Sequence, residues 1–260
     1  MKKNHLLIVM LLLCSGNLFA NFSDTTVKGV AVVFSYSASI FPDSWRTVEI
    51  NAYGKEIASA EIDRTKEVAI KALRKYPTPL LTANLKAIYF LKEMEFFKTP
   101  FGGTNSSDNL YITSDGLTHG YTNDYIEQTI HHEFSSILFR NHPEYLDTAA
   151  WNKANEPGFV YNDAAGGVGA IQNNQSSQDV DTILCKKGIL TQYALSAMEN
   201  DLNTLAQNLF CPNRGFWKAV EKYPRLKTKV ILLISFYSRF NPAYRESYFR
   251  KFDTYGDGLL

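Results

Sequence analysis

The segment between Asn123 and Pro143 constrains the fold more than any other part of the chain. Its apolar residues recur with a helical period of 3.6, and they are Ile126, Ile130, Phe134, Ile137 and Leu138. Asn123 or Asp124 can cap the start of such a helix, and Pro143 ends it. The pattern predicts an amphipathic helix that packs against a core supplied by the rest of the chain.

The composition is sufficient for such a core. Of the 260 residues, 45% are hydrophobic and 13% are aromatic, which argues against a disordered or fibrous protein. Lysine and arginine number 27 against 26 aspartate and glutamate residues, so the charge balance disfavours a nucleic-acid partner. The length allows one domain, or at most two small ones.

The first residues have the three parts of a secretory signal peptide. Lys2 and Lys3 precede an apolar run from Leu6 to Leu13, Gly16 breaks that run, and a small residue, Ala20, follows. The run is too short to span a bilayer. We therefore expect a signal peptide over residues 1–20. The alternative interpretation of the same apolar run is a buried N-terminal helix.

Cleavage after Ala20 implies export to the periplasm or the medium, with one domain over residues 21–260. A lipoprotein anchor at Cys14 is disfavoured because the preceding Leu13 is bulky. Cys185 and Cys211 are then the remaining cysteines, and in an oxidising compartment they could pair. Two buried free thiols are an equally good interpretation, because one pair of cysteines has no diagnostic spacing. No other apolar stretch reaches membrane-spanning length.

Short strands are predicted before this central helix, and helices after it. The β-branched and aromatic segments are 27–36, 47–52, 85–97 and 110–113. Helical spacing is found before Pro77 and over 202–209, 216–222, 226–238 and 242–251, although 230–237 could instead be a strand. Residues 152–182 are rich in Asn, Gly, Gln, Ser and Asp, and such a long excursion often covers a site. The order predicts an α+β fold.

The central helix contains the one segment that suggests chemistry. His132 and Glu133 fill the first two positions of the zinc-peptidase motif His-Glu-x-x-His, in which two histidines one turn apart bind zinc. Ser136 stands where the second histidine belongs, and a serine hydroxyl is a poor zinc ligand. His131 lies nearer the apolar stripe and could pack, or could replace the missing ligand. His142 follows at a third-ligand spacing that we interpret as chance.

Three stretches resemble a family of extracytoplasmic bacterial zinc metallopeptidases with the zincin, gluzincin-like fold. They are Leu85–Leu91 with Gly102–Asn105 and Leu110–Ile112, the helix around His131-His132-Glu133-Phe134, and Gln192–Asp201. The resemblance covers roughly residues 65–210. It implies a small mixed sheet beside an active-site helix, followed by a mostly helical C-terminal half.

The resemblance also implies roles for particular residues. His132 and Glu199 would bind zinc, with Asp201 as second choice for the acidic ligand and the third ligand unidentified. Glu133 would be the catalytic general base toward a metal-bound water. Ser196 and Glu199 also match a helix capping box, and a carboxylate used in a cap is not free for zinc.

Two functions therefore follow as expectations. One is a zinc metallopeptidase that hydrolyses a peptide bond if the altered motif still binds zinc. The other is a catalytically inactive protein of the peptidase fold that recognises an extracytoplasmic peptide or surface partner. In both, the stretch Gly102–Thr104 could border an edge strand that aligns an extended peptide. The sequence leaves the substrate and the oligomeric state open.

Overall fold

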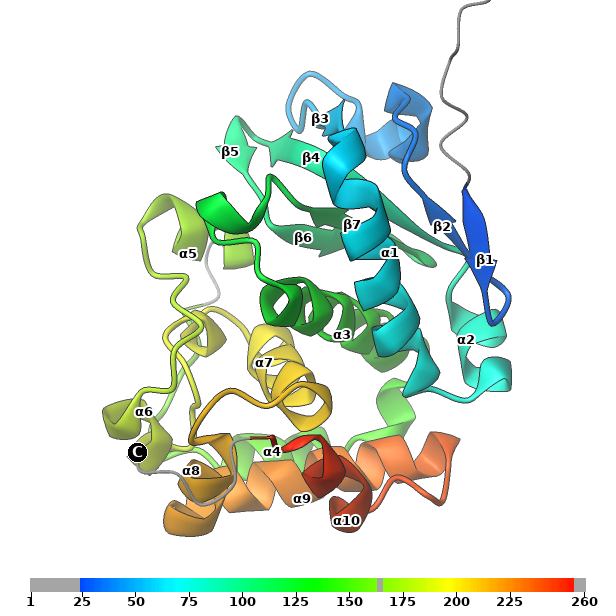
Figure 1. The fold of residues 1–260 in the computed structure, drawn as a ribbon. Coiled ribbons are helices and arrows are strands. Elements are labelled where there is room, and N and C mark those ends of the chain that lie inside the picture. The colour runs from blue at the N-terminus through cyan, green and yellow to red at the C-terminus, as the bar shows by residue number, and fades with distance from the viewer. Residues whose placement is uncertain (1–23, 163–165, 255–260) are drawn as a thin grey trace, which may run out of the picture.

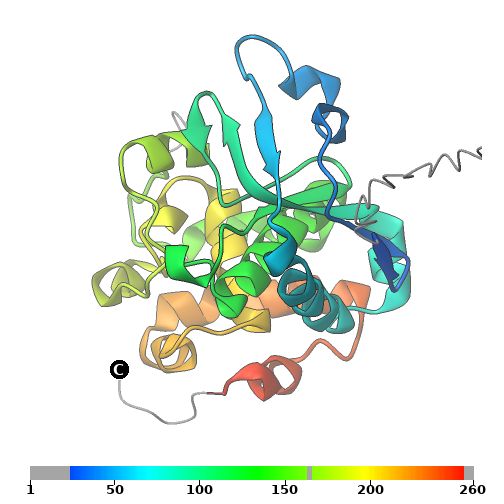
Figure 2. The same ribbon diagram turned by 45° about the horizontal axis from the view of Figure 1, so that its top comes forward.

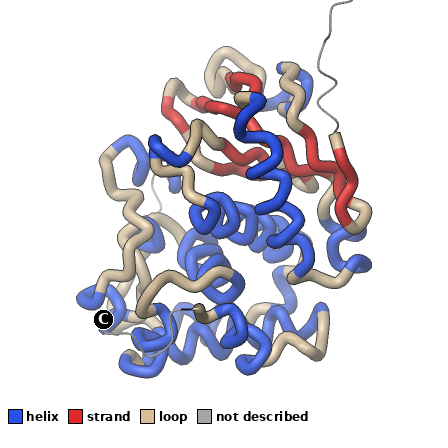
Figure 3. The backbone as a smooth tube through the Cα atoms, viewed as in Figure 1, coloured by secondary structure: helices blue, strands red, loops and turns tan. Residues whose placement is uncertain are grey.

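The computed structural model describes residues 24–162 and 166–254. The predicted signal peptide over residues 1–20 lies outside the described residues. The strands gather at one end of the molecule and most helices at the other (Figure 3). This is the mixed α+β architecture that the sequence predicts, and helix α3 lies between the sheet and the C-terminal helices (Figure 1).

One mixed sheet holds the strands, in the order β1-β2-β4-β7-β6. These strands are β1 (Thr25–Val27), β2 (Val30–Val33), β4 (Ala87–Phe96), β7 (Asn109–Thr113) and β6 (Gly103–Asn105). β4 is parallel to β2 and β7, whereas β6 runs antiparallel to β7 and forms an edge. Two further strands, β3 (Tyr53–Glu56) and β5 (Thr99–Pro100), pair with the distal half of β4.

The predicted strands form where apolar residues alternate or run together. Val30, Val32 and Phe34 are buried on one face, and Lys28 and Gly29 turn the chain with positive φ angles of 51° and 87°. The expected strand over 47–52 is wrong. The amide of Asn51 bonds to the carbonyl of Thr47 at 2.7 Å and Asn51 has a φ of 50°, so this segment turns and β3 starts after it.

The predicted helices before Pro77 and over 202–209, 216–222 and 226–238 are present, whereas the segment 242–251 is helical only from residue 246. The helices are α1 (Ser59–Arg74), α2 (Thr78–Asn84), α3 (Asn123–Asn141), α4 (Thr148–Lys153), α5 (Gly166–Gln172), α6 (Thr182–Lys187), α7 (Met198–Phe210), α8 (Phe216–Lys222), α9 (Pro224–Phe240) and α10 (Glu246–Phe249). The strand alternative for residues 230–237 is wrong, because they lie inside α9. No helix within the described ranges is both long and apolar enough to cross a membrane.

Helix α3 is the centre of the molecule. It begins one residue earlier than expected, because Thr122 is its cap and accepts a hydrogen bond from the amide of Tyr125 at 3.1 Å. α1, α7 and the strands β6 and β7 pack against it, and the turned view shows how these neighbours enclose it (Figure 2). Consequently most polar residues in the middle of the helix, between Glu127 and Ser136, are buried together with its apolar stripe, whereas those at its two ends are exposed.

The two cysteines are separate in this arrangement. Cys185 on α6 and Cys211 at the end of α7 are both buried and free. The Sγ atom of Cys185 faces the carbonyl of Leu190, and that of Cys211 faces the carbonyl of Asp124. The sequence left open whether these two cysteines form a disulfide or remain free thiols, and in the structure they are free thiols.

Candidate functional site

A cleft lies beside α3, and its lining residues come from α3, β6, α7 and the chain between α5 and α6. It consists of two adjoining pockets of about 260 and 430 Å³. Both are lined by Gly103, His132, Glu133 and Tyr193. The predicted motif residues therefore stand on the wall that the two pockets share.

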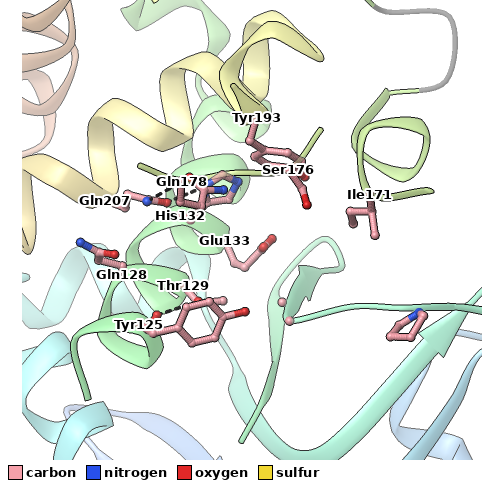
Figure 4. A pocket seen from close by; sticks show the side chains of 13 residues that line it. Tyr125, Gln128, Thr129, His132, Glu133, Ile171, Ser176, Gln178, Tyr193 and Gln207 are labelled. Carbon is pink, nitrogen blue, oxygen red and sulfur yellow. Dashed lines mark hydrogen bonds between the residues drawn. The ribbon is translucent and has the colours of Figure 1, made fainter. Parts of the chain in front are cut away.

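The smaller pocket is lined mainly by amides and hydroxyls, and we call it the amide pocket. Its distinguishing residues are Gln128, Gln178, Gln207, Tyr125, Thr129 and Ser176 (Figure 4), and Pro100 and Ile171 add apolar lining. The larger one contains an arginine, and we call it the arginine pocket. Its distinguishing residues are Asn105, Ser136, Arg140, Glu199, Asn200 and Asn203.

Glycines let β6 approach α3 closely enough to form this wall. A Cβ atom on Gly102 would collide with the hydroxyl of Tyr125, and one on Gly103 would collide with Thr129 and come within 3.0 Å of Glu133 Oε1. Larger residues at these two positions would push the strand away from the helix. The pair of glycines in the sequence is therefore explained by a close strand–helix contact.

His132 faces the cleft, and α7 orients its ring. Its Nδ1 atom lies 2.8 Å from Oε1 of Gln207, and since an amide oxygen accepts, Nδ1 carries the proton. The free lone pair is then on Nε2. Burial lowers the pKa of His132 to about 4, with the Gln207 hydrogen bond and the charge of Glu199 opposing that shift. The ring is therefore neutral at pH 7.

Glu133 projects from α3 into the open space between β6 and α7 (Figure 4). Its Oε2 atom accepts a hydrogen bond from Nδ2 of Asn105 at 2.5 Å. Burial raises the pKa of Glu133 to about 7, and Asn105 and Arg140 oppose the rise while the charge of Glu199 adds to it. A carboxyl group in this state can exchange a proton near neutral pH, as a general base requires.

Glu199 reaches back to the motif helix. Its Oε1 atom accepts hydrogen bonds from the hydroxyl of Ser136 and, at 3.3 Å, from Nη1 of Arg140. The alternative capping box with Ser196 is wrong: the residue that precedes α7 is Ala197, which is extended, and Ser196 instead donates to the carbonyl of Tyr193. The structure thus brings His132 and Glu199 into one pocket, as the sequence analysis expects.

Other candidates from the sequence lie elsewhere. Asp201, the second choice for the acidic ligand, is fully buried and pairs with Lys229 on α9 at 2.5 Å. His131 packs in the core, where its Nδ1 atom lies 2.8 Å from the hydroxyl of Tyr76. His142 stacks on Tyr145 beyond the end of α3. None of these three histidine or aspartate side chains lines either pocket.

Sequence reasoning missed Arg140, Asn203 and Gln207, although a signal for them exists. On α3, positions 132, 136 and 140 are spaced by four, and on α7 positions 199, 203 and 207 have the same spacing. Residues four apart share one face of a helix. Two polar stripes therefore meet directly where α3 packs against α7, as the His132–Gln207 and Ser136–Glu199 hydrogen bonds show, and a search for facing i, i+4 patterns could have found them.

Arg140 holds the centre of the arginine pocket. Its Nη1 atom donates to Ser136 Oγ at 2.9 Å as well as to Glu199, and its Nη2 atom donates to Asn105 Oδ1 and to the carbonyl of Ser106 at 2.7 Å. The guanidinium group thus uses its planar fork to join α3, α7 and the end of β6. It places a positive charge beside Glu199, the first choice of the sequence analysis for the acidic metal ligand.

The donors present do not fit a zinc ion with three protein ligands. Within residues 24–162 and 166–254, the only group of three His, Cys, Asp or Glu donors close enough to share an ion is Asp124, Glu127 and Cys211, away from His132. In the arginine pocket, Ser136 replaces a histidine and Glu199 is already bound by Arg140. The guanidinium group of Arg140 lies beside Glu199 and already supplies this carboxylate with a positive charge.

Comparison with known proteins supports the fold at a coarse level. No family model and no curated protein matches this chain. Among solved structures, the fold is similar to a protein described as a putative zinc-binding metallo-peptidase from Bacteroides caccae, with a TM-score of 0.51 and 16% identity over 75% of this chain and 74% of that one. The chain therefore has a metallopeptidase-like fold.

Proposed function

We propose that this protein is a catalytically inactive peptide-binding protein with a metallopeptidase-like fold. The observation that carries the proposal is the guanidinium group of Arg140, which is hydrogen-bonded to Glu199, Ser136 and Asn105. A zinc ion that used Glu199 would have to stand next to this permanent positive charge. The cleft contains His132 and Glu199 as candidate zinc ligands and Glu133 as a candidate base. A catalytic zinc site needs a third protein ligand beside the first two.

The edge of the sheet supports a peptide as the partner. The amide of Thr113 bonds to the carbonyl of Gly102 and the amide of Ser106 to the carbonyl of Asn109, both at 2.9 Å. In an antiparallel pair the backbone groups alternate in direction, so those of Gly103 and Asn105 point away from β7. An extended peptide can pair with this free edge by β-augmentation. It would then cross both pockets.

Zinc titration tests the inactive state. We expect isothermal titration of the chelator-treated protein to show no stoichiometric zinc site of micromolar affinity or tighter. We expect the double replacement Ser136→His and Arg140→Ala to create one, because it restores a second imidazole and removes the cation. The matched control is Arg74→Ala, an exposed arginine on α1, which should bind no more zinc than the parent protein.

A single tight zinc equivalent in the unaltered protein, lost in His132→Ala, would overturn the proposal. That result would favour the other expected function, a zinc-dependent peptide hydrolase with Glu133 as base. This alternative is supported by the free Nε2 atom of His132 and by the pKa of about 7 for Glu133. It still lacks a third ligand.

Export is part of the same proposal. The basic start and apolar run of residues 2–13 support it, and a peptide from the cell surface or periplasm would then be the partner. N-terminal sequencing of the protein from the extracytoplasmic fraction tests this step. The expected first residue is Asn21, and a chain that keeps Met1 and stays in the cytoplasm would contradict it.

A further inference from the structure

The amide pocket has a fixed pattern of hydrogen-bonding groups. Nε2 of Gln128 donates to the backbone carbonyl of Cys211 and to Oδ1 of Asn213, both at 2.8 Å. A backbone carbonyl can only accept, so the nitrogen of Gln128 is held on that side. Both of its hydrogens are used, and Oε1 remains as an acceptor of the pocket wall.

A second glutamine supplies the complementary group. Oε1 of Gln178 accepts from Nε2 of Gln207 at 3.3 Å, and Gln207 is itself fixed by His132. The Nε2 hydrogens of Gln178 are then left as donors. Asn213 holds the two glutamines in one unit, because it accepts from Gln128 and donates to the backbone carbonyl of Gln178 at 3.3 Å.

We infer that the amide pocket selects a carboxamide side chain, Gln or Asn, of a peptide bound along β6. This inference rests on the proposed function and names the kind of peptide that it binds. A carboxamide offers one acceptor and one donor group, which match Gln178 and Gln128 respectively. A carboxylate would face the Gln128 oxygen without a hydrogen to donate, and an aliphatic side chain would leave both groups unpaired.

The position of the pocket along β6 fits this assignment. Gly102 and Gly103 line the amide pocket, whereas Thr104 and Asn105 line the arginine pocket. A peptide paired with the strand therefore passes from one pocket to the other. Pro100 and Ile171, which also line this pocket, provide apolar contact for the methylene groups of a glutamine side chain.

Glu133 stands on the shared wall and offers a competing preference. An ionised carboxylate there would attract a lysine or arginine side chain instead. The hydrogen bond from Asn105 engages Oε2, on the side of the arginine pocket, and leaves Oε1 near Gly103. The experiment must therefore separate carboxamide from basic side chains.

A binding selection makes this test. A positional-scanning library of hexapeptides is passed over the immobilised full-length protein, and the retained peptides are sequenced by mass spectrometry. We expect Gln or Asn to be enriched at one position roughly tenfold over Glu, Leu and Lys, the effect of about one hydrogen bond. Gln178→Leu should abolish that enrichment. Gln175→Leu, an exposed glutamine outside both pockets, should leave it unchanged.

The outcomes separate the inference from the function on which it rests. Retention of no peptide would overturn the proposed function. Retention with a basic, acidic or apolar preference at every position would overturn the carboxamide assignment alone. A carboxamide preference that survives both Gln178→Leu and Gln128→Leu would place its recognition outside the amide pocket and contradict the assignment.

Discussion

Helix α3 carries two histidine–carboxylate pairs that differ in their surroundings. Glu127 and His131 face the core, where the ammonium groups of Lys71 and Lys75 lie 2.6 and 2.5 Å from the carboxylate of Glu127. His132 and Glu133 face the cleft, where the nearby cation, Arg140, binds Glu199 instead. One pair is neutralised by its neighbours and the other is left open to a ligand.

The carboxyl pKa values show the consequence. Burial alone would raise the pKa of Glu127, but the interactions with His131, Lys75 and Lys71 outweigh burial and hold that pKa well below its usual range. For Glu133, burial raises the pKa to about 7, and the hydrogen bond from Asn105 and the charge of Arg140 oppose that rise only in part. A neutralised carboxylate stabilises the fold, whereas a carboxyl group with a raised pKa costs stability and is typical of a functional site.

The largest expected effect is on the core side. Glu127→Gln removes the partner of two lysines at a fully buried position, and we expect it to reduce the free energy of unfolding by about 3–5 kcal/mol. Urea denaturation measures this change. The control is Glu67→Gln, an exposed position on α1, with an expected change within about 0.5 kcal/mol. A loss below about 1 kcal/mol for Glu127→Gln would contradict the comparison.

The next largest expected effect is a difference in stability between alanine variants of the two histidines. His131→Ala removes a ring that stacks on Phe210 and contacts the hydroxyl of Tyr76, so we expect a loss of about 2–4 kcal/mol. His132→Ala empties a place beside the cleft, where water can enter, and should cost about 1 kcal/mol. Equal losses of stability for the two variants in thermal or urea unfolding would show that the core and cleft faces of α3 contribute alike to stability, and would contradict the comparison.

On the cleft side, acid should lower the free energy of unfolding through protonation of His132. The pKa of His132 in the folded protein, about 4, lies below the ordinary histidine pKa of 6.5, so the unfolded chain binds more protons between these pH values. Stability from this residue is present above pH 6.5 and is lost as pH falls toward 4. From pH 6.5 to 4.5 the parent protein should lose about 2–3 kcal/mol more than His132→Gln. Parallel pH profiles of the two proteins would contradict this assignment.

The smallest expected effect is a gain. The pKa of Glu133 is about 7 in the folded protein, against an ordinary glutamate pKa of 4.5, so the native state binds more protons and loses stability as the pH rises from 4.5 to 7. Glu133→Gln keeps an acceptor for Asn105 and should stabilise the protein by about 1–3 kcal/mol at pH 8, with little change at pH 4.5. If Glu133→Gln were less stable than the parent protein at pH 8, the Glu133 carboxylate would be stabilising the fold, and the contrast with Glu127 would be contradicted.

Local patterns were enough to predict much of the fold. The 3.6-residue stripe from Ile126 to Leu138 lies inside α3, the β-branched segment 85–97 contains β4, and 216–222 is α8. These elements are predictable because their burial repeats with a period that the sequence displays. The strand expected over 47–52 failed because a tight turn at Asn51 overrode the β propensity of its residues.

The site was less predictable because it depends on contacts between distant helices. Adjacent histidines look alike in sequence, and only the positions of α1 and α7 decide that His131 is packed and His132 faces the cleft. The bond between Ser136 and Glu199 spans 63 residues, whereas the capping box that competed with it spans three. A local pattern cannot show which of these the folded chain adopts.

The enclosure of α3 by the sheet, α1 and α7 couples the cleft to the whole molecule. Because the middle of this helix is buried, we expect its amide protons to exchange with solvent only when the protein opens globally. A ligand that binds only the native cleft raises that opening free energy according to its concentration and affinity. The deuterium uptake of Phe134 is therefore a gauge of cleft occupancy, and it works for a ligand whose identity is still unknown.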